Sequence, residues 1–157
     1  MAFVEIGLPV TLHYSPEEAV VGLNWRRVFL GGLLAGLIVN VFQILWSGIV
    51  LGRQWQAAIQ ALDRPLPRAA VWIFVVESFG MGIVATWLYA AVRPRFGPGP
   101  KSAILAGFVY WIIGYALPAM GIAQTGVFPV SLLVFTNLGG LIVIILATLV
   151  GASFYNE

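Results

Sequence analysis

The sequence predicts an all-α polytopic membrane protein with four transmembrane helices, a short N-terminal arm and one helix in the membrane interface. Four long apolar runs occupy most of the 157 residues, and Glu77 is the only charged residue inside any of them. A bilayer core of about 30 Å takes roughly 20 residues of helix to cross, and backbone polar groups in lipid must pair within the chain. Each run is therefore predicted to span the membrane. The four runs cover residues 28–51, 70–92, 102–123 and 131–153.

Composition places the chain in lipid and limits it to one folded unit. Hydrophobic residues make up 61% of the chain and charged residues 9%, values that would leave a water-soluble domain with large exposed apolar patches. We expect a cytoplasmic N-terminal arm over residues 1–24 and a transmembrane bundle over residues 25–157, with no room for a second domain. The net charge of +2 comes from residues at membrane edges, so it does not indicate nucleic-acid binding.

The N-terminal arm ends in two consecutive helix-start signals. Ser15, Pro16 and Glu18 have the order of an N-cap, a first-turn proline and a capping-box glutamate, which predicts a short helix to about Leu23. Asn24 is then placed to cap the first transmembrane helix. The arm is too apolar for a free tail, so we expect it to lie on the membrane or on another protein. It lacks a basic region followed by an apolar run, and it is not predicted to be a cleaved signal peptide.

Two of the connections have distinct patterns. Residues 53–62 carry apolar side chains at helical spacing from Trp55 to Leu62, which predicts a short helix lying in the membrane interface. The prolines in residues 63–67 end that helix and return the chain to the membrane. Residues 93–101 hold several glycines and prolines in succession, which predicts a tight, stiff loop.

Basic residues predict the orientation of the chain. If the helices alternate in direction, five cations lie on the side of the termini, against three arginines on the other side, at positions 53, 64 and 68. The positive-inside rule then places both termini in the cytoplasm. We expect the five cations to contact lipid headgroups or a partner protein. They are Arg26, Arg27, Arg93, Arg95 and Lys101.

Small residues predict where the helices touch. In lipid, helix association depends on close packing of small residues and on interhelical hydrogen bonds. In the second span, Glu77 shares one face with Gly80, while Ser78 shares a neighbouring face with Gly82, and both faces are candidates for burial. We expect six glycines to lie at helix contacts: Gly32, Gly36, Gly82, Gly107, Gly114 and Gly140.

Polar residues inside the spans are expected to form one layer. At a rise of 1.5 Å per residue, four of them lie about 20 to 25 Å from the cytoplasmic end. They are Gln43, Glu77, Tyr115 and Asn137, with Asn40 beside them on the first helix. A charged carboxyl is costly in this environment, so Glu77 either holds a proton or faces a hydrated cavity. It is either a proton or cation site, or a structural acid that hydrogen-bonds the amides and fixes helix register.

The residue types that chemistry needs are scarce. The chain has no cysteine and a single histidine, His13, which precedes the first span. One membrane carboxyl and one distant imidazole do not assemble a hydrolytic pair, a metal cluster or two haem ligands. We therefore expect no enzyme activity, no catalytic residue, no metal and no cofactor.

Two segments carry a resemblance to a known group. The stretch from Leu88 to Lys101, together with the Asn-Trp-Arg-Arg sequence from Asn24 to Arg27, resembles a group of small bacterial four-helix membrane proteins. The similarity covers about residues 24 to 154. It implies the fold and a location in a bacterial inner membrane, without carrying any functional residue to this chain. Small multidrug transporters also have four helices and a lone membrane glutamate. They place that acid in the first helix, where this chain has Asn40 and Gln43.

Two functional hypotheses follow from these patterns. The first is a non-catalytic membrane protein that acts through helix and loop contacts, as an accessory or structural subunit of a larger membrane complex or as a homo-oligomer. Its partners would be the lipid bilayer and other membrane subunits or itself. The alternative is a small proton-coupled or cation transporter or channel that uses Glu77.

Overall fold

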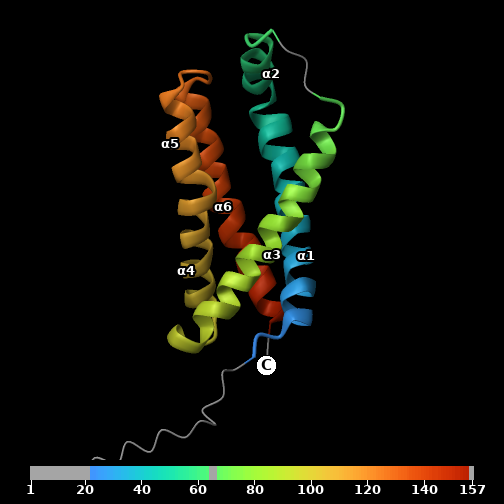
Figure 1. The fold of residues 1–157 in the computed structure, drawn as a ribbon, viewed down its shortest axis with the longest axis vertical. Helices are drawn as coiled ribbons and strands as arrows, with labels where there is room; N and C mark the ends of the chain where they lie inside the picture. Colours follow the sequence, from blue (N-terminus) through green and yellow to red (C-terminus); the bar gives the residue numbers. More distant parts are fainter. Residues whose placement is uncertain (1–21, 64–66, 156–157) are drawn as a thin grey trace, which may run out of the picture.

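The computed structural model describes residues 22–63 and 67–155, and this part of the chain folds as a bundle of helices (Figure 1). Four segments are long and apolar enough to cross a membrane, which confirms the predicted fold class. The elements in chain order are α1 (Trp25–Gln43), its π-helical continuation η1 (Ile44–Val50), α2 (Gly52–Gln60), α3 (Ala70–Phe96), α4 (Pro100–Trp111), the π-helical η2 (Ile112–Ala116), α5 (Leu117–Gln124) and α6 (Val130–Phe154).

Both described ends of the chain lie at the same end of the bundle, which we call the terminal end. The side chain of Asn24 caps α1 by accepting a hydrogen bond from the backbone N–H of Arg27 at 3.2 Å, as predicted. The backbone N–H of Asn24 also donates to the hydroxyl of Tyr155 at 3.1 Å. This bond ties the start of the first span to the end of the last one. The short helix predicted before Leu23 lies mostly outside the described residues.

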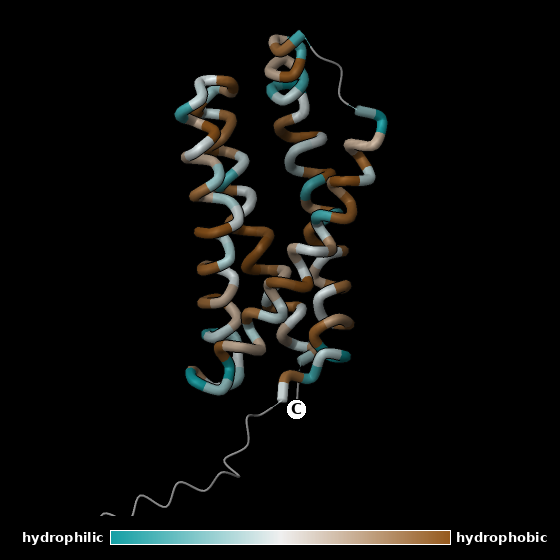
Figure 2. The backbone as a smooth tube through the Cα atoms, in the orientation of Figure 1, coloured by the Kyte–Doolittle hydropathy of each residue, from teal (hydrophilic) through white to brown (hydrophobic). Residues whose placement is uncertain are grey.

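Hydrophilic residues gather mainly at the two ends of the bundle (Figure 2). The opposite end carries the short helix α2, and we call it the α2 end. This helix was predicted over residues 53–62 and is observed over Gly52–Gln60. Its Ala58 is buried with Leu51 and Leu132, so α2 packs onto the start of α6.

The connection between α3 and α4 is shorter than predicted. Helix α3 was expected to end near residue 92, but it continues through Pro94 to Phe96, and the next residue, Gly97, has a φ of 82° that stops it. Beyond the end of α3, two side-chain hydrogen bonds satisfy backbone groups of the turn. The hydroxyl of Ser102 donates to the carbonyl of Gly97 at 2.7 Å, and the hydroxyl of Tyr89 accepts from the N–H of Gly99 at 3.3 Å. The turn therefore closes over three residues.

Helices α1 and α3 touch backbone to backbone at glycines. A Cβ atom added at Gly82 would collide with the backbone of Gly32 and Gly36, and one added at Gly36 would lie 2.6 Å from Cα of Phe79. Such contacts exclude any side chain larger than hydrogen. They permit the close approach on which helix association in lipid depends.

Helix α6 contacts α1, α3 and α4 and forms the centre of the bundle. Its glycines receive large or polar side chains from the surrounding helices: Trp46 lies against Gly139, Tyr115 against Gly140, and Thr86 against Gly151. On the other side, a Cβ at Gly107 of α4 would lie 3.1 Å from Cα of Ile145. Every span thus meets α6 at a position where one side lacks a side chain.

Gly114 differs from the expectation. The nearest atoms to a Cβ at this position belong to the ring of Tyr110, at 2.9 Å, in the preceding turn of the same segment. The glycine leaves room for that ring within the widened η2 turn rather than for another helix. Three glycines outside the six expected ones do lie at interhelical contacts: Gly31, Gly139 and Gly151.

Replacing Gly82 by leucine should break the α1–α3 contact. The new side chain meets backbone that cannot move aside, and overpacking of this kind costs about 1–3 kcal/mol or more. Thermal unfolding in a mild detergent measures the effect as a lower midpoint than wild type. Gly121→Leu is the matched control, because a Cβ at Gly121 meets nothing within 4 Å. Equal midpoints for the two variants would contradict the assigned contact.

Candidate functional site

Glu77 lies on an exposed face of α3. Around it, the side chains of Ile73 and Val76 are 60% and 70% exposed. The side of α3 that packs into the bundle carries Ser78 and Gly82, both buried. The structure therefore buries one of the two candidate faces of this helix and leaves the Glu77 face open.

Glu77 nevertheless belongs to the membrane-spanning part of α3. It lies sixteen residues from Arg93, a distance of about 24 Å along a helix that rises 1.5 Å per residue. A hydrocarbon core of about 30 Å measured from the cations at the terminal end would include this position. Glu77 is thus an exposed carboxyl inside the span, nearer to the α2 end.

The predicted polar layer is not one hydrogen-bonded group. The amide of Asn40 donates to the carbonyls of Gly36 at 3.1 Å and Val75 at 3.4 Å, which bridges α1 and α3. The carbonyl oxygen of the Gln43 side chain accepts from Ser47 at 3.2 Å. The amide of Asn137 donates to its own helix, to the carbonyl of Leu133 at 3.0 Å. Within the described part of the chain, no hydrogen bond joins any two of Glu77, Gln43, Asn40, Tyr115 and Asn137.

Two tyrosines are the polar groups that the structure places near Glu77. The hydroxyl of Tyr115 donates to the sulfur of Met81 at 3.5 Å, and Met81 is one turn from Glu77 on α3. Tyr110 and Met81 both pack against the buried cluster that contains Tyr115. Tyr110 of α4 and Tyr115 of η2 therefore lie on the side of the third span that packs towards α3.

Two indoles, absent from the predicted polar layer, hold the neighbouring helices on α6. Nε1 of Trp111 donates to the backbone carbonyl of Asn137 at 2.9 Å, and Nε1 of Trp46 donates to that of Phe135 at 3.1 Å. The sequence gives the positions of the tryptophans, but it does not show which backbone carbonyls accept their hydrogen bonds. Each bond connects a span to the same stretch of α6.

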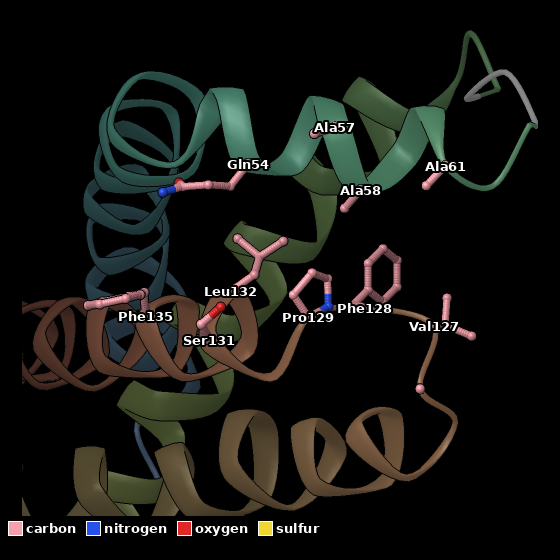
Figure 3. A pocket seen from close by; sticks show the side chains of 11 residues that line it. Gln54, Ala57, Ala58, Ala61, Val127, Phe128, Pro129, Ser131, Leu132 and Phe135 are labelled. Atoms are coloured by element: carbon pink, nitrogen blue, oxygen red, sulfur yellow. The ribbon is translucent and has the colours of Figure 1, made fainter.

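A pocket of about 560 Å³ opens at the α2 end, between α2 and the start of α6 (Figure 3). Alanines of α2 line one side, and Phe128, Pro129 and Leu132 line the other. Gln54 and Ser131 are its polar groups. A mostly apolar lining with two hydrogen-bonding groups suits an acyl chain or another apolar molecule, and it offers no acid or base.

The five predicted headgroup cations lie together at the terminal end. Arg26 and Arg27 open α1, Arg93 and Arg95 close α3, and Lys101 opens α4. The guanidinium of Arg93 lies 5.7 Å from the ring centroid of Tyr155, a cation–π arrangement. The structure therefore brings these residues to one end, where they can meet anionic headgroups or an acidic partner surface.

Replacing Trp111 by phenylalanine should weaken the bundle modestly. The variant loses the hydrogen bond to the carbonyl of Asn137 but keeps an aromatic ring against Phe108, whose centroid is 5.7 Å away. Interhelical hydrogen bonds in membranes average about 0.6 kcal/mol and reach about 1.7. Trp72→Phe is the control, because Trp72 is largely exposed. Equilibrium unfolding of both variants in detergent micelles measures the difference, and equal stabilities would show that the bond contributes nothing.

Comparison with known proteins finds no matching family model, no similar curated protein and no similar solved structure. The geometry of the site is thus the basis for a functional proposal. Its distinctive feature is a carboxyl in a membrane span that has no hydrogen bond within the described part of the chain.

Proposed function

We propose that this chain is a non-catalytic membrane subunit that acts by binding other membrane-spanning helices, from a larger complex or from copies of itself. The observation that carries the proposal is the exposure of Glu77 inside the span of α3. Ionisable residues in membrane spans almost always face protein or a water-filled cavity, because facing lipid is costly. Within the described part of a single chain, Glu77 faces neither protein nor a water-filled cavity. Another polypeptide would supply the protein contact that this carboxyl lacks.

The surroundings of Glu77 support a contact rather than a reaction. The amide of Asn40 and the indole of Trp111, both half-buried, donate to backbone carbonyls of this chain, so they hold the helices in place. Within the described spans, Glu77 is a carboxyl that faces outwards and makes no hydrogen bond with this chain. A group used for assembly has this property, because its partner arrives with the second protein.

The charge distribution supports a location in a bacterial inner membrane with both termini in the cytoplasm. Five cations gather at the terminal end, while the described residues of the α2 end carry Arg53 and Arg68 together with the acid Asp63. The positive-inside rule favours the terminal end as the cytoplasmic one. The same cations would bind headgroups of anionic lipids and orient the bundle.

A small proton-coupled or cation transporter is the second candidate. The hydrogen bond from Tyr115 to Met81, one turn from Glu77, favours it, because this bond places a phenol near the carboxyl of the span. Acids inside membrane spans often form proton or cation sites. This candidate requires Glu77 to exchange with water on both sides of the membrane. An assembly role requires no such path.

Extraction from the native membrane into lipid nanodiscs, followed by native mass measurement, distinguishes the two candidates. A subunit is expected at a mass well above the 17.0 kDa of one chain. Glu77→Gln should keep that mass because glutamine also donates and accepts hydrogen bonds. Glu77→Leu removes both abilities and should shift the population towards single chains.

The transporter candidate predicts a different result in liposomes. Proton or cation flux would then exceed that of empty liposomes and fall to their level in Glu77→Gln. A single 17.0 kDa chain in nanodiscs combined with such a flux would overturn the proposed function. Flux equal to that of empty liposomes for both proteins is the outcome that the assembly role predicts.

A further inference from the structure

Helix α3 carries a continuous exposed stripe on the side that faces away from the bundle. Its members follow one another in steps of four and three residues, and every one of them is exposed. We call this set the Glu77 stripe. It consists of Ile73, Glu77, Gly80, Val84, Trp87 and Ala91.

The buried side of the same helix has the same spacing. Ser78, Gly82, Ala85 and Tyr89 also follow in steps of four and three, and all four are buried. Alternating steps of four and three average 3.5 residues, the period that keeps one face of a helix against a partner in a left-handed pair. Helix α3 therefore carries two packing faces, of which the described part of the chain uses one.

Gly80 gives the exposed stripe a glycine, the residue type that lets helices approach closely on the buried face. On the buried face, Gly82 allows the backbone of α1 to approach α3 directly. On the exposed face, a Cβ at Gly80 would meet nothing within 4 Å. Gly80 thus offers an equivalent point of close approach that is unoccupied. Lipid chains could also cover the apolar residues and the glycine of this stripe. The carboxyl of Glu77 favours protein over lipid, because facing lipid is costly for an ionisable group.

Resting on the proposed function, we propose that the Glu77 stripe is the contact between two copies of this chain, α3 against α3. Copies that share one orientation in the membrane bring their α3 helices together in parallel. A two-fold axis along the membrane normal then sets each residue of the stripe opposite its counterpart at the same depth.

The symmetry supplies the partner that Glu77 lacks. Any other protein would need a polar group placed at the depth of Glu77, whereas a second copy brings Glu77 itself. A protonated carboxyl has one donor and remaining acceptor capacity, so two facing carboxyls satisfy one another. Gly80 lies one turn away and lets the two backbones come close enough for that contact.

Cysteine crosslinking tests this contact, because the chain has no cysteine of its own. Val84→Cys lies in the stripe at a position that is 46% exposed, and Ile142→Cys lies on α6 at a matched 50%. After oxidation in native membranes, the yield of crosslinked dimer should be at least about tenfold higher for Val84→Cys than for Ile142→Cys. A second stripe variant, Gly80→Cys, should give the same excess over Ile142→Cys. A tenfold ratio corresponds to a free-energy difference of about 1.4 kcal/mol. Equal yields at positions 84 and 142 would overturn the contact.

The role of the carboxyl is tested in the Val84→Cys background. Adding Glu77→Gln should leave the crosslinking yield unchanged, because the amide also donates and accepts. Adding Glu77→Leu should lower dimerisation by about three- to tenfold, the factor for one interhelical hydrogen bond in lipid. The same yield in both double variants would show that Glu77 does not hold the two copies together.

A photoreactive crosslinker attached at position 84 separates this inference from the proposed function. Capture of a second copy supports both. Capture of a different polypeptide in place of a second copy overturns the α3–α3 contact but leaves the assembly role intact. Capture of lipid alone, with a native mass of 17.0 kDa in nanodiscs, overturns both.

Discussion

The close contact between α1 and α3 at Gly32, Gly36 and Gly82 is the constraint on which the rest of the structure depends. Lipid supplies no hydrophobic driving force between helices, so the bundle is held by van der Waals contact and interhelical hydrogen bonds. The absence of side chains at these three positions lets two backbones meet. It also fixes the rotation of α3 about its axis, and that rotation decides which residues point out of the bundle.

The outward face of α3 follows from this rotation. With Gly82 turned towards α1, Glu77 and Gly80 point away from the bundle. Several other polar groups of the spans are used internally: Asn40 connects α1 to α3, and the indoles of Trp46 and Trp111 connect η1 and α4 to α6. The proposed assembly role thus rests on the contrast between one outward carboxyl and several groups paired within the chain.

Sequence patterns could predict the spans, the cap at Asn24 and several glycine contacts, because the length of an apolar run and the positions of small residues can be read directly from the sequence. They could not predict the direction of Glu77. Gly80 and Gly82 are both small and lie on different faces of α3, so either could have met α1. The continuation of α3 through Pro94 to Phe96 was also missed, since a proline normally ends or kinks a helix.

Oxygen accessibility of a spin label in lipid bilayers tests most directly whether protein covers the outward face of α3. Labels attached through Val84→Cys and Ile142→Cys start from similar exposure in a single chain. The account predicts far fewer collisions with dissolved oxygen at position 84 than at position 142, because only the first is covered by another helix. Equal, lipid-like collision rates at both positions would contradict it, since the Glu77 face would then be open to the bilayer.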